Sequence, residues 1–211
     1  MKRLIVASSN PGKLREIAHA LEPAGIEVAS LSALSDPALV EEHGSTFEEN
    51  ARAKAEAYSM RTDLPVLADD SGLEVDALGG APGVASARFG GAALDDAGRS
   101  RLLLELLRAA GADAPDDRTA RFRCVLALAL AGRTLATFEG VVEGVILDEP
   151  RGHNGFGYDP LFFHPPSGRT TAELDTAQKQ AVSHRGQALA ALVAALERGD
   201  PRLAPFGLRV G

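Results

Sequence analysis

The spacing of apolar residues along the first part of the chain predicts a strand, a helix and a second strand. Residues 3–9, RLIVASS, contain a short apolar run and predict a buried strand. A helix is predicted from Pro11 to about Pro23, because apolar residues then recur at helical spacing, at Leu14, Ile17, Ala18 and Leu21. Residues 26–30 predict a second strand. The chain therefore opens with a strand, a short turn and a helix.

The next segments predict a capped helix and a strand that carries acidic residues. Ser45 and Glu48 have the spacing of a capping box, and a helix is predicted over residues 46–60. Residues 66–78 predict a strand that breaks at two adjacent carboxylates, residues 69 and 70, and then resumes. Both acids are therefore expected at the end of a buried strand.

Helical and strand patterns continue to alternate in the second half of the chain. Leucines at helical spacing predict a helix around residues 102–107. Residues 121–130 and 135–146 predict two antiparallel strands joined by the turn AGRT. A last helix begins after Ser183 and stops before Gly199. Helices interleaved with strands predict an α/β fold built on a mixed, strongly twisted sheet.

Composition limits the class of protein. The 211 residues are 45% hydrophobic, which suffices for a single domain over residues 1–211, built as one globular unit or two closely packed lobes. Long apolar runs and a signal-peptide pattern are both missing, so we expect no membrane span and a cytoplasmic location. The net charge of −7, without a cluster of Lys or Arg, argues against a polymeric nucleic-acid partner. Cys124 lies in an apolar run, which favours buried packing.

The segment SSNPGK, residues 8–13, leaves the first strand and opens the first helix. Its backbone N–H groups, hydroxyls and the Lys13 ammonium would surround the positive end of a helix dipole, which favours phosphate binding. Turns of this composition are also common as plain helix caps. The motif alone leaves both interpretations open.

A lysine on the second predicted helix is expected to point inward. Asn50 and Lys54 lie one turn apart and flank the apolar stripe that contains Phe47 and Ala51. A buried ammonium is costly unless it meets an anion or extends out to solvent. Ligand contact and an extended, solvated side chain remain alternatives.

The adjacent acids Asp69 and Asp70, followed by Ser71, indicate a cation site. Two carboxylates at one place repel each other unless a cation or a proton intervenes, and Mg²⁺ takes one or two carboxylates while water and phosphate supply its other ligands. Glu41 and Glu42, in the loop before the capped helix, are candidate further ligands. An Asx-type turn is the alternative for this motif taken alone.

Two later segments suggest recognition of a planar, anionic ligand. HNGFGYDPLFF places Phe156 between glycines, where a base could stack on the ring, although core packing is the simpler explanation for Phe162 and Phe163. KQAVSHRGQAL places His184 and Arg185 in the first turn of a helix, where cations oppose the dipole, so we expect no folding rationale for this pair.

These segments make sense together for a Mg²⁺-bound nucleoside triphosphate. Five of them, in order and over nearly the whole chain, closely resemble the inosine/xanthosine triphosphate pyrophosphatases, which remove non-standard purine nucleotides: SSNPGKLREI, TFEENARAKA, LADDSGLEVDALGGAPGVASARF, GFGYDPLFF and KQAVSHRGQAL. The resemblance implies hydrolysis of ITP, dITP and XTP to the nucleoside monophosphate and pyrophosphate. It also implies a Mg²⁺ cofactor, a homodimer, and a long mixed sheet with flanking helices and two lobes around a nucleotide-binding cleft.

The same resemblance implies roles for individual residues. Asp70 would be the catalytic base and, with Glu42, a metal ligand; whether Glu41 or Asp69 also binds the metal stays open. Phosphate contacts are implied for residues 8–13 and Lys54, and base and sugar contacts for residues 156–159. The implied substrate-binding residues are Ser8, Ser9, Asn10, Pro11, Gly12, Lys13, Lys54, Ser71, Arg88, Phe156, Gly157, Tyr158, Asp159, Lys179, His184 and Arg185.

Two other function classes fit parts of the sequence. A phosphatase that uses Asp69 or Asp70 as a nucleophile would form an aspartyl-phosphate and release orthophosphate. A nucleotide-binding module without turnover would bind tightly and release no product. Neither accounts for the aromatic and His184-Arg185 segments as well as the pyrophosphatase does.

Overall fold

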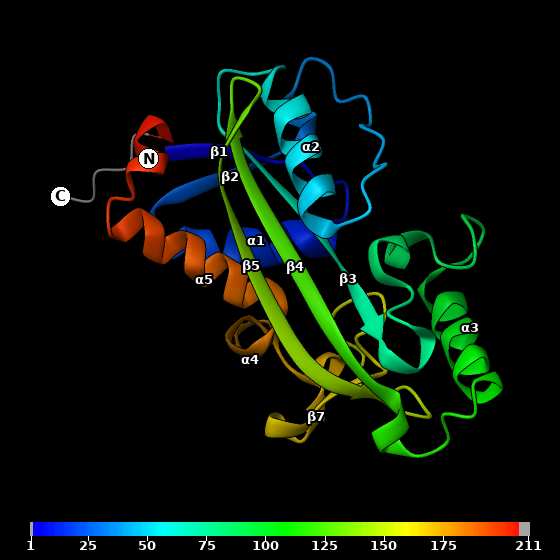
Figure 1. Cartoon of the computed structure of the whole chain (residues 1–211). Helices are drawn as coiled ribbons and strands as arrows, with labels where there is room; N and C mark the ends of the chain where they lie inside the picture. Colours follow the sequence, from blue (N-terminus) through cyan, green and yellow to red (C-terminus); the bar gives the residue numbers. More distant parts are fainter. Residues whose placement is uncertain (1, 207–211) are drawn as a thin grey trace. The chain divides into compact units, whose positions relative to one another are not determined.

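The computed structural model describes residues 2–206, in which seven strands form one sheet (Figure 1). Across the sheet the strand order is β2-β1-β3-β4-β5-β6-β7. The strands are Lys2–Val6 (β1), Ile26–Ser30 (β2), Val66–Val75 (β3), Thr119–Leu130 (β4), Arg133–Ile146 (β5), Phe162–His164 (β6) and Arg169–Thr170 (β7). Strand β1 pairs parallel with β2 and β3, whereas β6 pairs antiparallel with β5 and β7. The predicted mixed sheet of an α/β fold is confirmed.

The described part of the chain also contains five α-helices, besides short 3₁₀ turns. They are Pro11–Leu21 (α1), Phe47–Ser59 (α2), Asp96–Ala109 (α3), Thr176–Val182 (α4) and His184–Glu197 (α5). Within residues 2–206, none of them combines the length and the apolar character that crossing a bilayer requires.

The described chain divides into two compact units. The first unit contains the residues up to Asp70, residues 124–140 and the residues from Arg185 onward. The second unit contains residues 71–123 and 141–184. The expectation of a single domain over residues 1–211 remains a prediction.

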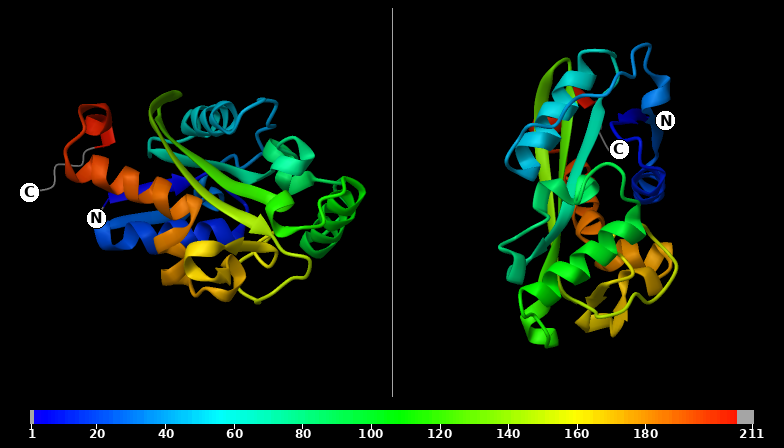
Figure 2. Two further views of the ribbon diagram at one scale, coloured as in Figure 1. Left: turned by 60° about the horizontal axis from the view of Figure 1, so that its bottom comes forward. Right: turned by 90° about the vertical axis from the view of Figure 1, so that its right-hand side faces the viewer.

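The core of the first unit lies between its part of the sheet and two helices. Inward-facing strand residues such as Val6, Leu67 and Leu126 pack against Ile17 of α1 and Leu192 of α5. Figure 2 shows α1 and α5 on one face of these strands and α2 on the other. The apolar stripes predicted from the sequence are the surfaces that form these contacts.

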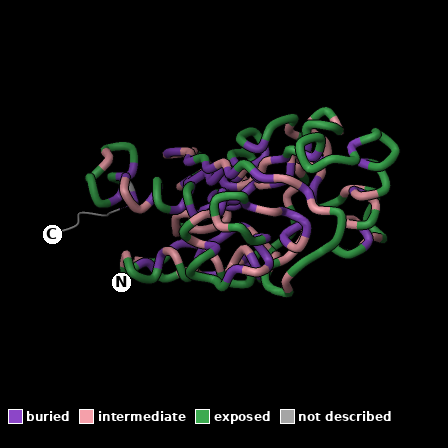
Figure 3. Tube along the Cα trace, turned by 90° about the horizontal axis from the view of Figure 1, so that it is seen from below, coloured by how far each residue is buried: buried purple, intermediate pink, exposed green. Residues whose placement is uncertain are grey.

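The core of the second unit involves the last part of β3 and the first part of β4. Leu73 of β3, Phe122 of β4 and Phe162 of β6 pack with Leu103 and Leu107 of α3. Figure 3 follows the burial of the strands and the exposure of the connecting loops along the Cα trace.

Several predicted boundaries differ from the structure. The first strand ends at Val6 and not at residue 9, because Asn10 already caps α1. The capping box lies one residue later than predicted: Thr46 Oγ1 accepts from Glu49 N at 3.1 Å, and Glu49 Oε2 accepts from Thr46 N at 3.2 Å. The helix α4 and the short strand β7 were not predicted from the pattern, since seven and two residues are too few for a repeating apolar pattern to be recognised.

The predicted break of the strand at the two acids is wrong. Strand β3 continues from Val66 to Val75 through Asp69, Asp70 and Ser71. A 3₁₀ turn, Asp76–Leu78, follows it. The acids therefore lie in the middle of a strand, where consecutive side chains point to opposite faces of the sheet.

A two-residue turn joins the long strands β4 and β5, which lie side by side in Figure 1. Ala131 has φ 50° and Gly132 has φ 77°, so both turn residues adopt left-handed backbone conformations. This geometry matches the right-handed twist of a hairpin, which was predicted with slightly shorter strands. Ala131 thus adopts a backbone conformation that Asn and Gly reach at lower cost.

The turn generates a prediction about stability. We expect Ala131→Asn to raise the free energy of unfolding by about 0.5–1 kcal/mol, because Asn adopts the left-handed conformation more readily than Ala. Ala131→Val should lower it by about 1 kcal/mol, because a β-branched residue is poorly tolerated at positive φ. Urea unfolding of both variants measures the two opposite changes, and a shift of the same sign in both would refute this account of the turn.

Candidate functional site

An asparagine cap closes the turn between β1 and α1. Asn10 Oδ1 accepts hydrogen bonds from Gly12 N at 2.8 Å and from Lys13 N at 3.2 Å, and Ser8 Oγ accepts from Asn10 N at 3.1 Å. Ser9 is exposed, and Pro11 occupies the first helical position, where its missing N–H has no cost. The capping interpretation therefore describes this turn in the structure, and phosphate binding by it stays a prediction.

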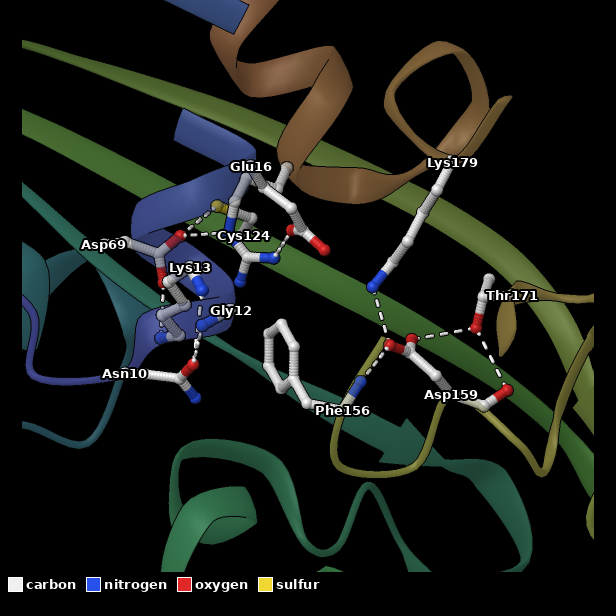
Figure 4. Close-up of polar contacts among 11 residues, drawn as sticks. Asn10, Gly12, Lys13, Glu16, Asp69, Cys124, Phe156, Asp159, Thr171 and Lys179 are labelled. Atoms are coloured by element: carbon white, nitrogen blue, oxygen red, sulfur yellow. Dashed lines mark hydrogen bonds and ion pairs between the residues drawn. The ribbon is translucent and has the colours of Figure 1, made fainter. Parts of the chain in front are cut away.

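The Lys13 side chain reaches from α1 to the carboxylate of Asp69 on β3. Lys13 Nζ lies 2.5 Å from Asp69 Oδ1, and Arg185 Nε of α5 donates to Asp69 Oδ2 at 2.7 Å. The buried Cys124 Sγ also donates to Asp69 Oδ2, at 3.2 Å. Arg185 Nη1 pairs with Glu16 Oε2 at 2.5 Å. Figure 4 shows Lys13, Glu16, Asp69 and Cys124 in this cluster.

The cations decide the ionisation of Asp69. Burial acts to raise the pKa of this carboxyl, but Arg185 and Lys13 outweigh it and hold the pKa well below its usual range. Burial, together with the Asp69 charge, raises the pKa of the Cys124 thiol well above its ordinary value. Asp69 is therefore an ionised counter-ion, and Cys124 is a protonated, buried thiol, as its apolar setting predicted.

The carboxylate of Asp70 belongs to the other face of β3, together with α2. Lys54 of α2 forms an ion pair with Glu42, and its Nζ donates to the backbone oxygen of Asp69 at 3.1 Å. Among the described residues, no hydrogen bond of ordinary geometry reaches buried Asp70 Oδ2 or buried Asn50 Nδ2, although the Asn50 amide is near enough to lower the pKa of Asp70. Asn50 is held by its other amide atom, because Gly44 N donates to Asn50 Oδ1 at 2.7 Å.

Asp70 differs from its neighbour in its affinity for a proton. Burial is the largest influence and raises the pKa of Asp70 to about 6; Glu42 acts in the same direction, and Lys54 and Lys13 oppose it. A carboxyl group with a pKa near neutrality can accept a proton and release it again at physiological pH.

The expectation that the adjacent acids share one place at a strand end is wrong. Alternation along β3 separates them, and Asp69 uses both oxygens on cations and on Cys124. Glu41 is exposed and pairs with His43 at 2.9 Å. In the part of the chain that the structure describes, no three His, Cys, Asp or Glu side chains form a metal-binding group. Asp70 and Glu42 are a pair of neighbouring carboxylates, because Glu42 acts to raise the pKa of Asp70.

In the second unit, the carboxylate of Asp159 holds three groups. Its Oδ2 accepts from Phe156 N at 2.8 Å and from Lys179 Nζ at 2.6 Å, and its Oδ1 accepts from Thr171 Oγ1 at 2.8 Å. Lys179 Nζ also lies 4.9 Å from the centroid of the Phe156 ring (Figure 4). Gly155 is required here, because a Cβ at this position would collide with the Asp159 carboxylate.

The other predicted site residues of the second unit contact residues outside the Asp159 cluster or lie at its surface. Tyr158 donates its hydroxyl to Ser86 O at 3.1 Å, and burial raises the pKa of its phenol to about 12. The His184 ring stacks on Phe122, with centroids 4.8 Å apart. Gly157 N donates to Asp96 Oδ2 at 2.8 Å. Ser71 is half-buried on β3, and Arg88 is exposed at the end of the 3₁₀ turn Gly83–Arg88.

The structure supplies a folding rationale for His184 and Arg185 that the sequence analysis did not expect. Arg185 is 1% exposed and neutralises the buried Asp69, and His184 packs on an aromatic ring. The charge of Arg185 at this helix N-terminus is therefore compensated by ion pairs with Asp69 and Glu16.

Several partners of the predicted residues were not found from the sequence, among them Glu16 and Thr171. Glu16 follows Lys13 by three positions on α1, and this helical spacing is a signal that both side chains lie on one face. Thr171 had no such signal, because it meets Asp159 only through the fold.

Comparison with known proteins gives consistent matches over most of the chain. A sequence model of the Ham1 family matches residues 4–195. A dITP/XTP pyrophosphatase of Bacillus licheniformis is 48% identical over 94% of this chain and 100% of its own length. A dITP/XTP pyrophosphatase of Geobacter sulfurreducens is 54% identical over 91% of this chain and 95% of its own. The solved structure of a HAM1 protein from Coxiella burnetii superposes with a TM-score of 0.82, at 45% identity, and covers 94% of this chain and 100% of that one.

The raised pKa of Asp70 predicts how stability changes with pH. The folded state binds this proton more tightly than the unfolded state, because the pKa is about 6 instead of 3.8, so the contribution of Asp70 to stability is lost as pH rises through this window. Asp70→Asn removes the titration. Relative to wild type, we expect the variant to gain about 1 kcal/mol of unfolding free energy between about pH 5 and about pH 7.5.

Urea unfolding in EDTA, with wild type and variant at both pH values, measures this difference. A gap between the two proteins that stays constant with pH would contradict the assigned pKa.

Proposed function

The chain belongs to the Ham1 family, and on this premise we propose that it hydrolyses ITP, dITP and XTP to the nucleoside monophosphate and pyrophosphate. The relatives named dITP/XTP pyrophosphatase support the proposal, because the similarity extends over more than nine-tenths of this chain and of theirs. Removing such nucleotides from the nucleotide pool is the role that follows.

The observation that carries the proposal is the environment of Asp70. Its carboxylate is buried, has an oxygen without a hydrogen-bond partner among the described residues, and has a pKa of about 6. These are the properties of a general base. In the proposed reaction Asp70 takes a proton from water, the resulting hydroxide attacks the α-phosphorus, and pyrophosphate leaves in line.

Cations near this acid fit the triphosphate. Lys13 is 16% exposed in its side chain and Lys54 is 13% exposed, so both ammonium groups are partly desolvated and attract phosphate oxygens more strongly than surface lysines do. In the proposal these two side chains, with residues 8–13 of the turn, bind the phosphates and stabilise the charge on the departing pyrophosphate.

The acids fit a Mg²⁺ ion. Asp70 offers a buried oxygen without a hydrogen-bond partner among residues 2–206, and Glu42 offers a second, partly exposed carboxylate close to the same lysine, Lys54. Two carboxylates with water and phosphate are a common ligand set for this ion. When bound, Mg²⁺ would neutralise phosphate charge and lower the pKa of water.

The remaining residues of the proposed substrate site recognise the base and the sugar. Phe156 offers a ring for stacking, and the contacts of Asp159 and Lys179 hold that ring and its loop in place. The other proposed contacts are Ser71, Arg88, Gly157, Tyr158, His184 and Arg185.

Selectivity follows from the direction of hydrogen bonds to the purine. Hypoxanthine and xanthine carry an acceptor oxygen at position 6, where adenine carries an amino donor. Arg185 is a donor-only side chain, and its Nε and Nη1 contact Asp69 and Glu16. In the proposal this guanidinium also faces position 6. A buried donor left unpaired by ATP would cost about 1–3 kcal/mol.

Two further expectations remain predictions. A homodimer is implied by the family resemblance, and a cytoplasmic location was expected from the sequence. Size-exclusion chromatography with light scattering tests the first.

The first functional prediction concerns the released product and the role of Asp70 as general base. With dITP and Mg²⁺, we expect pyrophosphate and no orthophosphate, and Asp70→Asn should lower kcat by about 100-fold or more, because the water loses its proton acceptor. Asp63→Asn, an exposed acid just before β3, is the matched control and should leave kcat unchanged.

Product analysis by phosphorus NMR decides between the function classes. Orthophosphate together with a trappable acyl-phosphate would favour the aspartyl-phosphate mechanism. Tight binding of dITP without any product would favour a binding module. Unchanged turnover in a folded Asp70→Asn protein would exclude Asp70 as the base.

The second functional prediction concerns substrate choice. We expect kcat/KM for ITP, dITP and XTP to exceed that for ATP by about 100-fold or more, since several unpaired buried donors act together against adenine. Initial rates of pyrophosphate release across these nucleotides and GTP measure the ratio. Equal efficiency with ITP and ATP would overturn the position-6 account.

A further inference from the structure

Four charged side chains of the first unit form a linear chain of ion pairs with alternating charge. Lys13 Nζ lies 2.5 Å from Asp69 Oδ1, Asp69 Oδ2 lies 2.7 Å from Arg185 Nε, and Arg185 Nη1 lies 2.5 Å from Glu16 Oε2. Lys13 and Glu16 are three positions apart on α1, so one helix supplies both ends of this chain of ion pairs. Figure 4 shows the two α1 side chains and Asp69.

Burial differs along this set of charges. The side chains of Asp69 and Arg185 are 0% and 2% exposed, whereas those of Glu16 and Lys13 are 13% and 16% exposed. Asp69 and Arg185 therefore stabilise each other, because removing one would leave the other as a buried charge with less compensation. Lys13 and Glu16 of α1 reach solvent. Of the two cations, only Lys13 has its side chain partly open to an incoming anion.

Both carboxylate oxygens of Asp69 are already engaged by neighbouring side chains. One oxygen binds Lys13, and the other accepts from both Arg185 and Cys124. The side chain also points to the face of β3 opposite to that of Asp70. This geometry argues against Asp69 as a metal ligand or as the acceptor of a proton from water.

We propose that Asp69 is a positioning residue that holds the Lys13 ammonium ready for phosphate, and that Glu16 holds Asp69 in place through Arg185. The inference rests on the proposed function in one respect, since the phosphate role of Lys13 comes from it. A free lysine side chain loses rotamer freedom when it is fixed, and a side chain already fixed by a partner does not lose it on binding.

Charge alone predicts the opposite effect, which makes the proposal easy to test. An acid close to an anion-binding lysine repels the anion, so neutralising that acid should tighten anion binding. Positioning predicts that neutralising Asp69 weakens anion binding while Lys13 is present. The sign of the change therefore separates the two.

The test is a double-mutant cycle on the Kd of inorganic pyrophosphate, measured by calorimetry with Asp69→Asn, Lys13→Met and the double variant. We expect Asp69→Asn to weaken binding about 10-fold in the protein that retains Lys13. In the Lys13→Met background, the same substitution should leave Kd within twofold or tighten it. Equal weakening in both backgrounds, or tightening in the first, would overturn the proposal.

Glu16→Gln provides a second variant, should Asp69→Asn fail to fold. It is a milder change at a partly exposed position, and it keeps an oxygen acceptor for Arg185. We expect pyrophosphate binding to weaken about threefold to fivefold with Lys13 and to stay unchanged without it. Glu27→Gln, which removes an exposed ion pair with Arg3 at 3.4 Å, is the matched control and should have no effect in either background.

Pyrophosphate binding does not depend on turnover, so the two proposals fail separately. A wild-type protein that binds pyrophosphate but leaves dITP intact would refute the proposed function, and the cycle would still decide the role of Asp69. A protein that hydrolyses dITP but gives equal weakening in both backgrounds would refute the positioning role alone.

Discussion

The alternation of side chains along β3 is the constraint on which the chemistry of the first unit depends. Asp69 and Asp70 are adjacent in sequence, but a continuous strand sends them to opposite faces of the sheet. Each carboxylate then meets a different set of helices: α1 and α5 on one side, and α2 on the other. One backbone geometry thus gives two neighbouring acids two different environments.

These environments explain why the two acids differ in protonation. Asp69 is buried between two cations, whose attraction outweighs the cost of burial, and it stays ionised. Asp70 is also buried, but the nearby acid Glu42 offsets part of the attraction of Lys54, so burial dominates and the pKa rises to about 6. A stable counter-ion and a titratable acid are separated by a single peptide bond.

A comparable arrangement organises the second unit. Asp159 binds Lys179, the backbone of Phe156 and the hydroxyl of Thr171, so one buried carboxylate fixes an aromatic ring and a cation at once. In both units a buried acid holds a lysine in place, and in both the lysine is among the few in the chain. The charge pairs restrict the conformations of these side chains before any ligand arrives.

The sequence by itself determined the fold class, the sheet-and-helix order, the burial of Cys124 and the family, because these depend on local periodicity and on motifs that can be compared along the chain. It placed Asp70, Lys54 and Lys13 among the candidate site residues, which remain predictions. The partners of these residues were decided only by the tertiary structure. Asp69 meets Arg185 across 116 positions, and Asp159 meets Thr171 across 12, and no local pattern encodes such contacts. The continuity of β3 through two acids was also missed, since the cations that make it tolerable come from distant helices.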